Sequence, residues 1–119
     1  MSSSPEKLDL ALAQRLRQVV AGQVTTEAEL RALAEQADGW ARATDAQLHA
    51  AEGRLTALNA DPASPLAEIA AEMRRVDALS RELQEARRLI GGLEDRTREL
   101  RTAWLKHHAD AGSPFGRNA

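Results

Sequence analysis

The feature that most constrains the fold is a cluster of turn-forming residues at the middle of the chain, Asn59-Ala60-Asp61-Pro62-Ala63-Ser64-Pro65. Proline cannot continue a helix, and it also pushes the residue before it out of the helical conformation. Ser64 can cap a following helix that has Pro65 at its first position. The cluster therefore predicts one helix that ends near residue 59 and another that begins near residue 65.

Apolar residues on both sides of this break follow the helical period. From Leu30 to Leu58 they recur in steps of three and four with a mean of about 3.5 residues, which is the coiled-coil spacing. The segment from Leu66 to Trp104 has the same rhythm. A short loop makes two such helices pack antiparallel, so we predict an all-α, coiled-coil-like antiparallel hairpin of long helices. The residues expected to pack in its seam and to recognise a partner are Leu30, Leu33, Trp40, Leu48, Leu55, Ile69, Val76, Leu83, Ile90, Leu93, Leu100 and Trp104.

The composition excludes several alternatives to this fold. The 119 residues include no cysteine, so a disulfide scaffold, a thiolate zinc site and a cysteine nucleophile are excluded. Aromatic residues make up only 3% of the chain, which is too few for a β-sandwich or barrel. The 16 basic and 18 acidic residues leave a net charge of −2, which argues against a dedicated DNA-wrapping protein.

We expect a single helical-hairpin domain over residues 1–111, with helices at about 5–59 and about 65–110, and a flexible tail at 112–119. The sequence of the first helix has two interpretations. It runs unbroken with a kink at Gly22, or it breaks near 22–25, where Thr26 and Glu29 form a capping box for a new helix. In the second interpretation, residues 5–21 form a separate short helix.

The chain has more apolar positions than one hairpin seam requires. With the loop centred near Pro62, facing residues have numbers that add up to about 125, and Trp104 then lies opposite Ala21 and Gly22. Either the first residues fold back as a third helix, or a second chain covers the surplus face; we expect association to complete the bundle. The apolar positions outside the two series include Leu10, Val20, Val24, Leu79, Leu89 and Leu105.

No constellation of residues indicates catalysis or a cofactor. His107 and His108 are adjacent, so on a helix they point about 100° apart and do not converge easily on one metal ion. His49, one turn after Asp45, lies on a charged face typical of solvated surface. The chain has no nucleophile motif, phosphate loop or zinc spacing, so we expect no enzyme, cofactor, metal or small-molecule substrate. It has no apparent secretory signal or apolar span, which favours a cytoplasmic protein.

Basic residues gather toward the end of the second helix. The expected register brings Arg15 and Arg17 to the same open end of the hairpin, where they would join this group in a basic patch. Nearby acidic residues dilute the patch, so a charged, solvated end is the simpler interpretation. The second-helix members of the patch are Arg98, Arg101 and Lys106.

The favoured function is a non-enzymatic scaffold that presents apolar helix faces to helices of a second copy or of another protein. The alternatives are an export or assembly chaperone that binds a partner segment, and a nucleic-acid accessory factor that uses the basic end. The Trp-bearing first segment and the Asp-Pro turn resemble part of a spectrin-type repeat, and the hairpin resembles small coiled-coil chaperones of bacterial flagellar and type III export. Both likenesses cover only the heptads and the turn, so no family is assigned and no residue roles follow.

Overall fold

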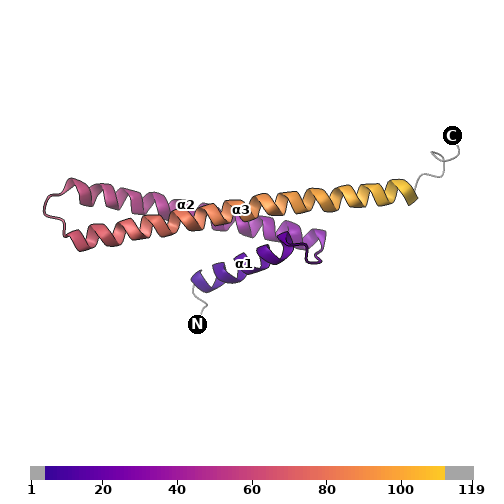
Figure 1. Ribbon diagram of the computed structural model, residues 1–119, viewed down its shortest axis with the longest axis horizontal. Coiled ribbons are helices and arrows are strands. Elements are labelled where there is room, and N and C mark those ends of the chain that lie inside the picture. The colour runs from indigo at the N-terminus through magenta and orange to yellow at the C-terminus, as the bar shows by residue number, and fades with distance from the viewer. Residues whose placement is uncertain (1–4, 112–119) are drawn as a thin grey trace.

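Over residues 5–111 the computed structural model forms three helices, in an elongated arrangement of 82 × 35 × 18 Å. α1 spans Pro5–Val20, α2 spans Glu27–Ala60 and α3 spans Leu66–Ala111. α2 and α3 pack side by side as a hairpin, and α1 folds back against them (Figure 1). The structure describes the backbone of residues 5–111 and the side chains of residues 10–109, so the expected tail at 112–119 lies outside it. The all-α antiparallel hairpin is confirmed, with a separate short N-terminal helix.

The turn between α2 and α3 is held by the residues that the sequence marks as turn formers. The backbone N–H of Asp61 donates to the Leu58 carbonyl at 3.3 Å and caps α2. The Asp61 carboxylate accepts from the N–H of Ala63 at 2.9 Å, and its carbonyl accepts from Ser64 at 3.0 Å. The Pro65 carbonyl accepts the first helical hydrogen bonds of α3. Pro65 therefore stands one position earlier in the helix than expected, as the cap itself.

At the break between α1 and α2, a glycine terminates the first helix and a threonine caps the second. Gly22 adopts φ +105°, which disfavours any residue with a side chain. The N–H of Gly22 donates to Val19 and the N–H of Gln23 donates to Gln18, both at 3.0 Å, which is a Schellman motif. Thr26 then caps α2, its hydroxyl accepting from the N–H of Glu29 at 3.0 Å. The chain therefore reverses at residues 21–26, and the unbroken helix over 5–59 is wrong.

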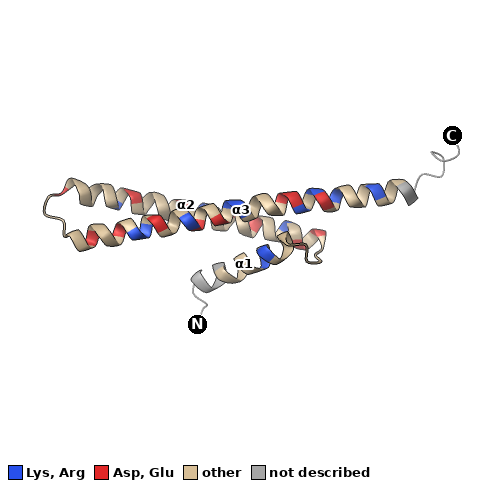
Figure 2. Cartoon of the chain, in the orientation of Figure 1, with Lys and Arg blue, Asp and Glu red and all other residues tan. Residues whose placement is uncertain are grey.

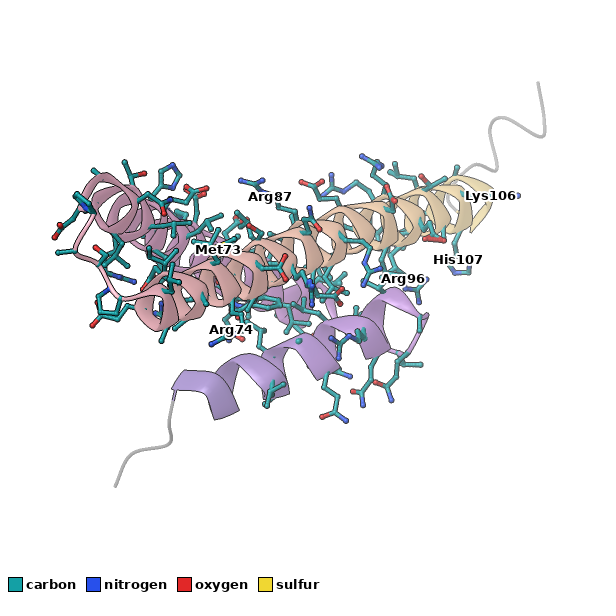
Figure 3. All side chains as sticks on the ribbon, turned by 60° about the vertical axis from the view of Figure 1, so that its left-hand side comes forward. Met73, Arg74, Arg87, Arg96, Lys106 and His107 are labelled. Atoms are coloured by element: carbon teal, nitrogen blue, oxygen red, sulfur yellow. The ribbon has the colours of Figure 1, made fainter. Side chains whose placement is uncertain are left out.

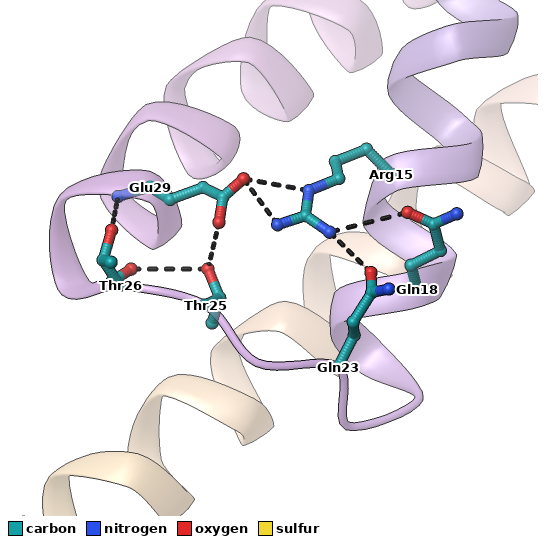
Figure 4. A network of polar contacts seen from close by, with 6 residues as sticks. All are labelled: Arg15, Gln18, Gln23, Thr25, Thr26 and Glu29. Atoms are coloured by element: carbon teal, nitrogen blue, oxygen red, sulfur yellow. Dashed lines mark hydrogen bonds and ion pairs between the residues drawn. The ribbon is translucent and has the colours of Figure 1, made fainter.

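Polar side chains tie α1 to the start of α2 across this break (Figure 4). Glu29 does not complete the expected capping box, because its carboxylate accepts from the Arg15 guanidinium at 2.6 and 2.9 Å and from the Thr25 hydroxyl at 2.7 Å. Arg15 also donates to the Gln23 side chain at 2.6 Å. The hydrogen bond from Arg15, followed by that from Thr25, lowers the pKa of Glu29 below its ordinary value of 4.5. The network fixes the direction in which α1 leaves α2.

The apolar core consists of two clusters along the hairpin. The larger one joins all three helices, and the smaller one, nearer the turn, is made by α2 and α3 alone. The smaller cluster contains Leu48, Ala51, Leu79 and Leu83. The larger cluster contains Ala13, Leu16, Val19, Leu30, Leu33, Ala37, Trp40, Ala86, Leu89 and Leu93. The third helix therefore covers only part of the hairpin, and the chain itself supplies some of the expected third layer.

A polar contact occurs where the two clusters meet. The Glu82 carboxylate accepts from the indole N–H of Trp40 at 2.9 Å and from the hydroxyl of Thr44 at 3.0 Å. Thr44 is buried, so its hydroxyl needs such a partner. A one-turn slip of α2 along α3 would leave these groups unpaired. The contact therefore fixes the register of the hairpin.

The end of α1 lies very close to the backbone of α3. A Cβ atom added to Gly92 would be 2.8 Å from Cγ1 of Val20, whereas one added to the adjacent Gly91 would meet nothing within 4 Å. Gly92 therefore permits α1 to approach α3 closely, and Gly91 has no such role.

The seam of α3 differs in phase from the predicted series. Leu66 and Met73, which belong to that series, are exposed, whereas Leu79 and Leu89, which lie outside it, are buried. Leu89 is buried because α1 also packs on α3 at that level, whereas Leu79 is buried against α2 alone in the smaller cluster.

Candidate partner-binding surface

α3 is longer than the helix that it packs against. The pairs Arg54–Glu72 (3.3 Å) and Thr44–Glu82 (3.0 Å) join α2 to α3 in the register expected from the turn. In this register Glu27, the first residue of α2, lies level with about residue 98 of α3. Residues 98–111, which we call the α3 extension, therefore project about 20 Å beyond α2 (Figure 1).

The apolar stripe of α3 continues onto this extension, and α2 covers only its beginning. Leu93 is buried and Leu100 is half-buried, but Trp104 is 57% exposed. Leu105, beside it, is 56% exposed. If the first helix had continued to residue 5, α2 would have covered Trp104 at the level of Ala21. Because α1 turns back at Gly22, the expected contact between Trp104 and that segment does not form.

A cleft of about 500 Å³ lies where the extension leaves the hairpin. Its floor includes Leu30, which is 5% exposed, and its outer wall includes Trp104. The cleft combines an apolar floor with polar groups at its edge, as sites that bind an apolar side chain do. Its lining residues are Thr25, Glu27, Leu30, Thr97, Leu100, Arg101, Trp104 and Leu105.

The Trp104 side chain is held in place by its neighbour one turn later. The His108 ring stacks on the indole with centroids 3.9 Å apart and an angle of 27° between the planes. Its Nδ1 also lies 2.9 Å from the Trp104 carbonyl. The ring of His107 contacts that of His108 edge-on. The histidines therefore orient the exposed indole, and an oriented aromatic side chain loses less entropy when a partner covers it.

The basic residues of the sequence do not form one patch. Arg15 binds Glu29 at 2.6 Å and Arg17 binds Glu85 at 3.3 Å, and residue 85 lies about 20 Å along α3 from residue 98. Arg17 therefore lies away from the end of α3, because the chain reverses before α2, and the grouping of Arg15 with the basic residues of α3 stays a prediction. The other three residues, Arg98, Arg101 and Lys106, all lie on the α3 extension. Figure 2 shows blue segments on this part of α3, and Figure 3 labels Lys106.

Most of the residues that we predicted to contact a partner already pack against other parts of the same chain. Eleven of the twelve are buried or half-buried, and only Trp104 is exposed. Sequence reasoning placed Leu105 outside the seam and did not identify the cleft. The lapse of the apolar series around Gly22 was the signal that the helix breaks there, so that α2 begins only after it and leaves the far end of α3 uncovered. The role of the twelve residues in partner recognition stays a prediction.

Other types of site find no support in the described part of the chain. None of the helices within residues 5–111 has the length and hydropathy needed to cross a bilayer. Among the side chains of residues 10–109, no group of three or more His, Asp or Glu is placed to hold a metal ion. His49 is exposed, and the hydrogen bond with the Asp45 carbonyl, together with the Asp45 carboxylate, raises its pKa above 6.5.

Comparison with known proteins gives no further assignment. No protein-family model matches the chain, and neither a curated protein nor a solved structure gives a significant match to it. No role is therefore carried over from a relative.

Proposed function

We propose that the protein is a non-enzymatic interaction protein that binds a partner helix along the α3 extension. The observation that carries this proposal is the continuation of the apolar stripe of α3 through Leu100 and Trp104 beyond the first residue of α2. A helix that lies in line with α2 would cover this stripe as α2 covers the preceding part. Binding would follow the helix-in-groove mode, with Trp104 as its aromatic anchor.

The exposed area indicates a modest affinity. Covering the exposed part of Trp104 and Leu105 removes about 200–250 Å² from water, which favours binding by roughly 5–6 kcal/mol at 25 cal/mol per Å². Loss of rotational and translational freedom offsets much of this gain. We therefore expect transient binding, or stable binding only within a larger assembly. A defined cleft with one oriented indole favours a helix over the varied unfolded segments that a chaperone binds.

The two tryptophans allow a direct test. Their indole N–H groups give two NMR signals, which the Trp104→Phe variant assigns. We expect a two-heptad helical peptide with leucine at the a and d positions and glutamine at the flanking positions to shift the Trp104 signal. The Trp40 signal should change little, because that indole is buried and bound to Glu82.

The matched variants are Trp104→Ala and Met73→Ala. Met73 is 56% exposed near the other end of α3, so it controls for the loss of an exposed apolar side chain on the same helix. Trp104→Ala should weaken peptide binding at least tenfold, and Met73→Ala should leave it unchanged. Equal loss in both variants, or no shift of the Trp104 signal in the wild-type protein, would refute the proposal.

A further inference from the structure

This inference rests on the proposed function and concerns the chemistry of the partner. The α3 extension carries a small excess of positive charge: residues 98–111 include Arg98, Arg101 and Lys106 and two acidic residues, Glu99 and Asp110. Arg98 pairs with Asp95 on its own helix. Neither Arg101 nor Lys106 forms an ion pair with another described residue.

Arg101 is the cation closest to the apolar surface. It lines the cleft together with Leu100 and Trp104. At 100° per residue, Arg98 lies on the same side of the stripe as Arg101, whereas Lys106 lies toward the opposite face of the helix. Glu27 also lines the cleft, but it is at the inner end, on α2, and pairs with Arg31 at 3.5 Å. One edge of the binding surface is therefore cationic along the extension.

We infer that the partner is an amphipathic helix with an acidic edge. Its apolar stripe covers Leu100 and Trp104, and carboxylates beside that stripe face Arg101 and Arg98, which flank Leu105 on the helix surface. Opposite charges at the edge of a helical interface set the choice of partner and its orientation more than they set the total affinity.

A second copy of the chain fits this surface less well. In a two-fold antiparallel pair with its axis at Arg101, the Arg101 side chains of the two copies would face each other. Like charges in such positions oppose association. Nucleic acid also fits less well, because a row of phosphates would meet Glu94, Asp95 and Glu99 among the basic residues.

Three peptides test the inference. All have two heptads, about the length of the extension, with leucine at the a and d positions, and they differ only in glutamate, glutamine or lysine at the flanking positions. We expect the glutamate peptide to bind about tenfold more tightly than the glutamine peptide, and the lysine peptide to bind most weakly. The advantage of glutamate should shrink as the salt concentration rises, because exposed charges are screened.

Charge reversal on the protein provides the matched comparison. In the variant Arg98→Glu with Arg101→Glu, the order of the three peptides should reverse. The control reverses Arg74 and Arg75, two adjacent exposed arginines near the start of α3, and should keep the wild-type order (Figure 3 shows Arg74). Circular dichroism of both variants checks that the helices are intact.

The outcomes separate this inference from the proposed function. Equal binding of the three peptides, or tightest binding of the lysine peptide, overturns the acidic partner but supports the binding of helices. Absence of binding by all three overturns the proposed function. A Trp104 signal that shifts with the concentration of the protein alone identifies a second copy as the occupant and overturns the inference. So does a shift caused by a thymidine oligonucleotide at lower concentration than the glutamate peptide.

Discussion

The adjacent glycines of α3 provide the sharpest test of how α1 is docked. In a helix interior, replacing glycine by alanine stabilises the protein by about 1 kcal/mol. Gly91→Ala should show this gain in full, because its Cβ would meet nothing within 4 Å. In Gly92→Ala the new Cβ would lie 2.8 Å from Cγ1 and 3.1 Å from Cγ2 of Val20. Val20 is a short, branched side chain that cannot move aside alone, so α1 must shift.

Overpacking of this kind costs about 1–3 kcal/mol. The net effect of Gly92→Ala is therefore a loss of about 0–2 kcal/mol, and the two variants should differ in unfolding free energy by about 1–3 kcal/mol. Urea unfolding followed by far-UV circular dichroism measures both. In a Val20→Ala background the obstruction is absent, and both glycine substitutions should then stabilise by about 1 kcal/mol. The reasoning fails if Gly92→Ala stabilises the protein with Val20 present as much as Gly91→Ala does.

Three further predictions concern α1 and its connection to α2. Leu16 is fully buried, so Leu16→Ala should lower the free energy of unfolding by about 2–5 kcal/mol. Hydrogen exchange should then show α1 losing protection before the α2–α3 hairpin does. Equal loss of protection in all three helices would contradict the docking of α1. Gly22→Ala should lower the urea midpoint because φ is +105°, whereas Gly39→Ala, in open space within α2, should raise it. The folded-state pKa of Glu29 is lowered, so its contribution is present above the unfolded value of 4.5 and is lost as the pH falls through the lower folded value. The difference in urea midpoint between wild type and Glu29→Gln should therefore disappear in acid, and a difference that persists there would exclude the Arg15 pairing as its cause.

The hairpin was predictable because its signals are local. Pro62 and Pro65 cannot lie inside a helix, and the apolar period on each side is that of a helix. The sum of facing residue numbers followed from the position of the turn, and the contacts of Glu82 with Trp40 and Thr44 agree with it.

The exposed surface at the end of α3 was less predictable because it depends on whether residues 21–26 form a turn or continue as a kinked helix. Thr26 was recognised as a cap, but a kinked continuous helix at Gly22 remained equally open. The Schellman hydrogen bonds at Gly22 and the contact of Val20 with Gly92 decide between them, and the second of these depends on tertiary packing. The same choice determines whether Trp104 is covered. The burial of Leu89 was missed for a related reason, since α1 widens the buried face of α3 at that level, whereas Leu79 packs against α2 alone.

The fold-back of α1 gives the two ends of the molecule different surroundings. The first residue of α1 lies beside the middle of the hairpin, whereas the last residue of α3 lies at the far tip of the rod (Figure 1). A fluorescent protein or a surface linker joined at the first residue of α1 would thus be held beside the middle of the hairpin, and it would leave Trp104 accessible. The same cargo joined at the last residue of α3 would lie next to Trp104 and compete with whatever approaches it.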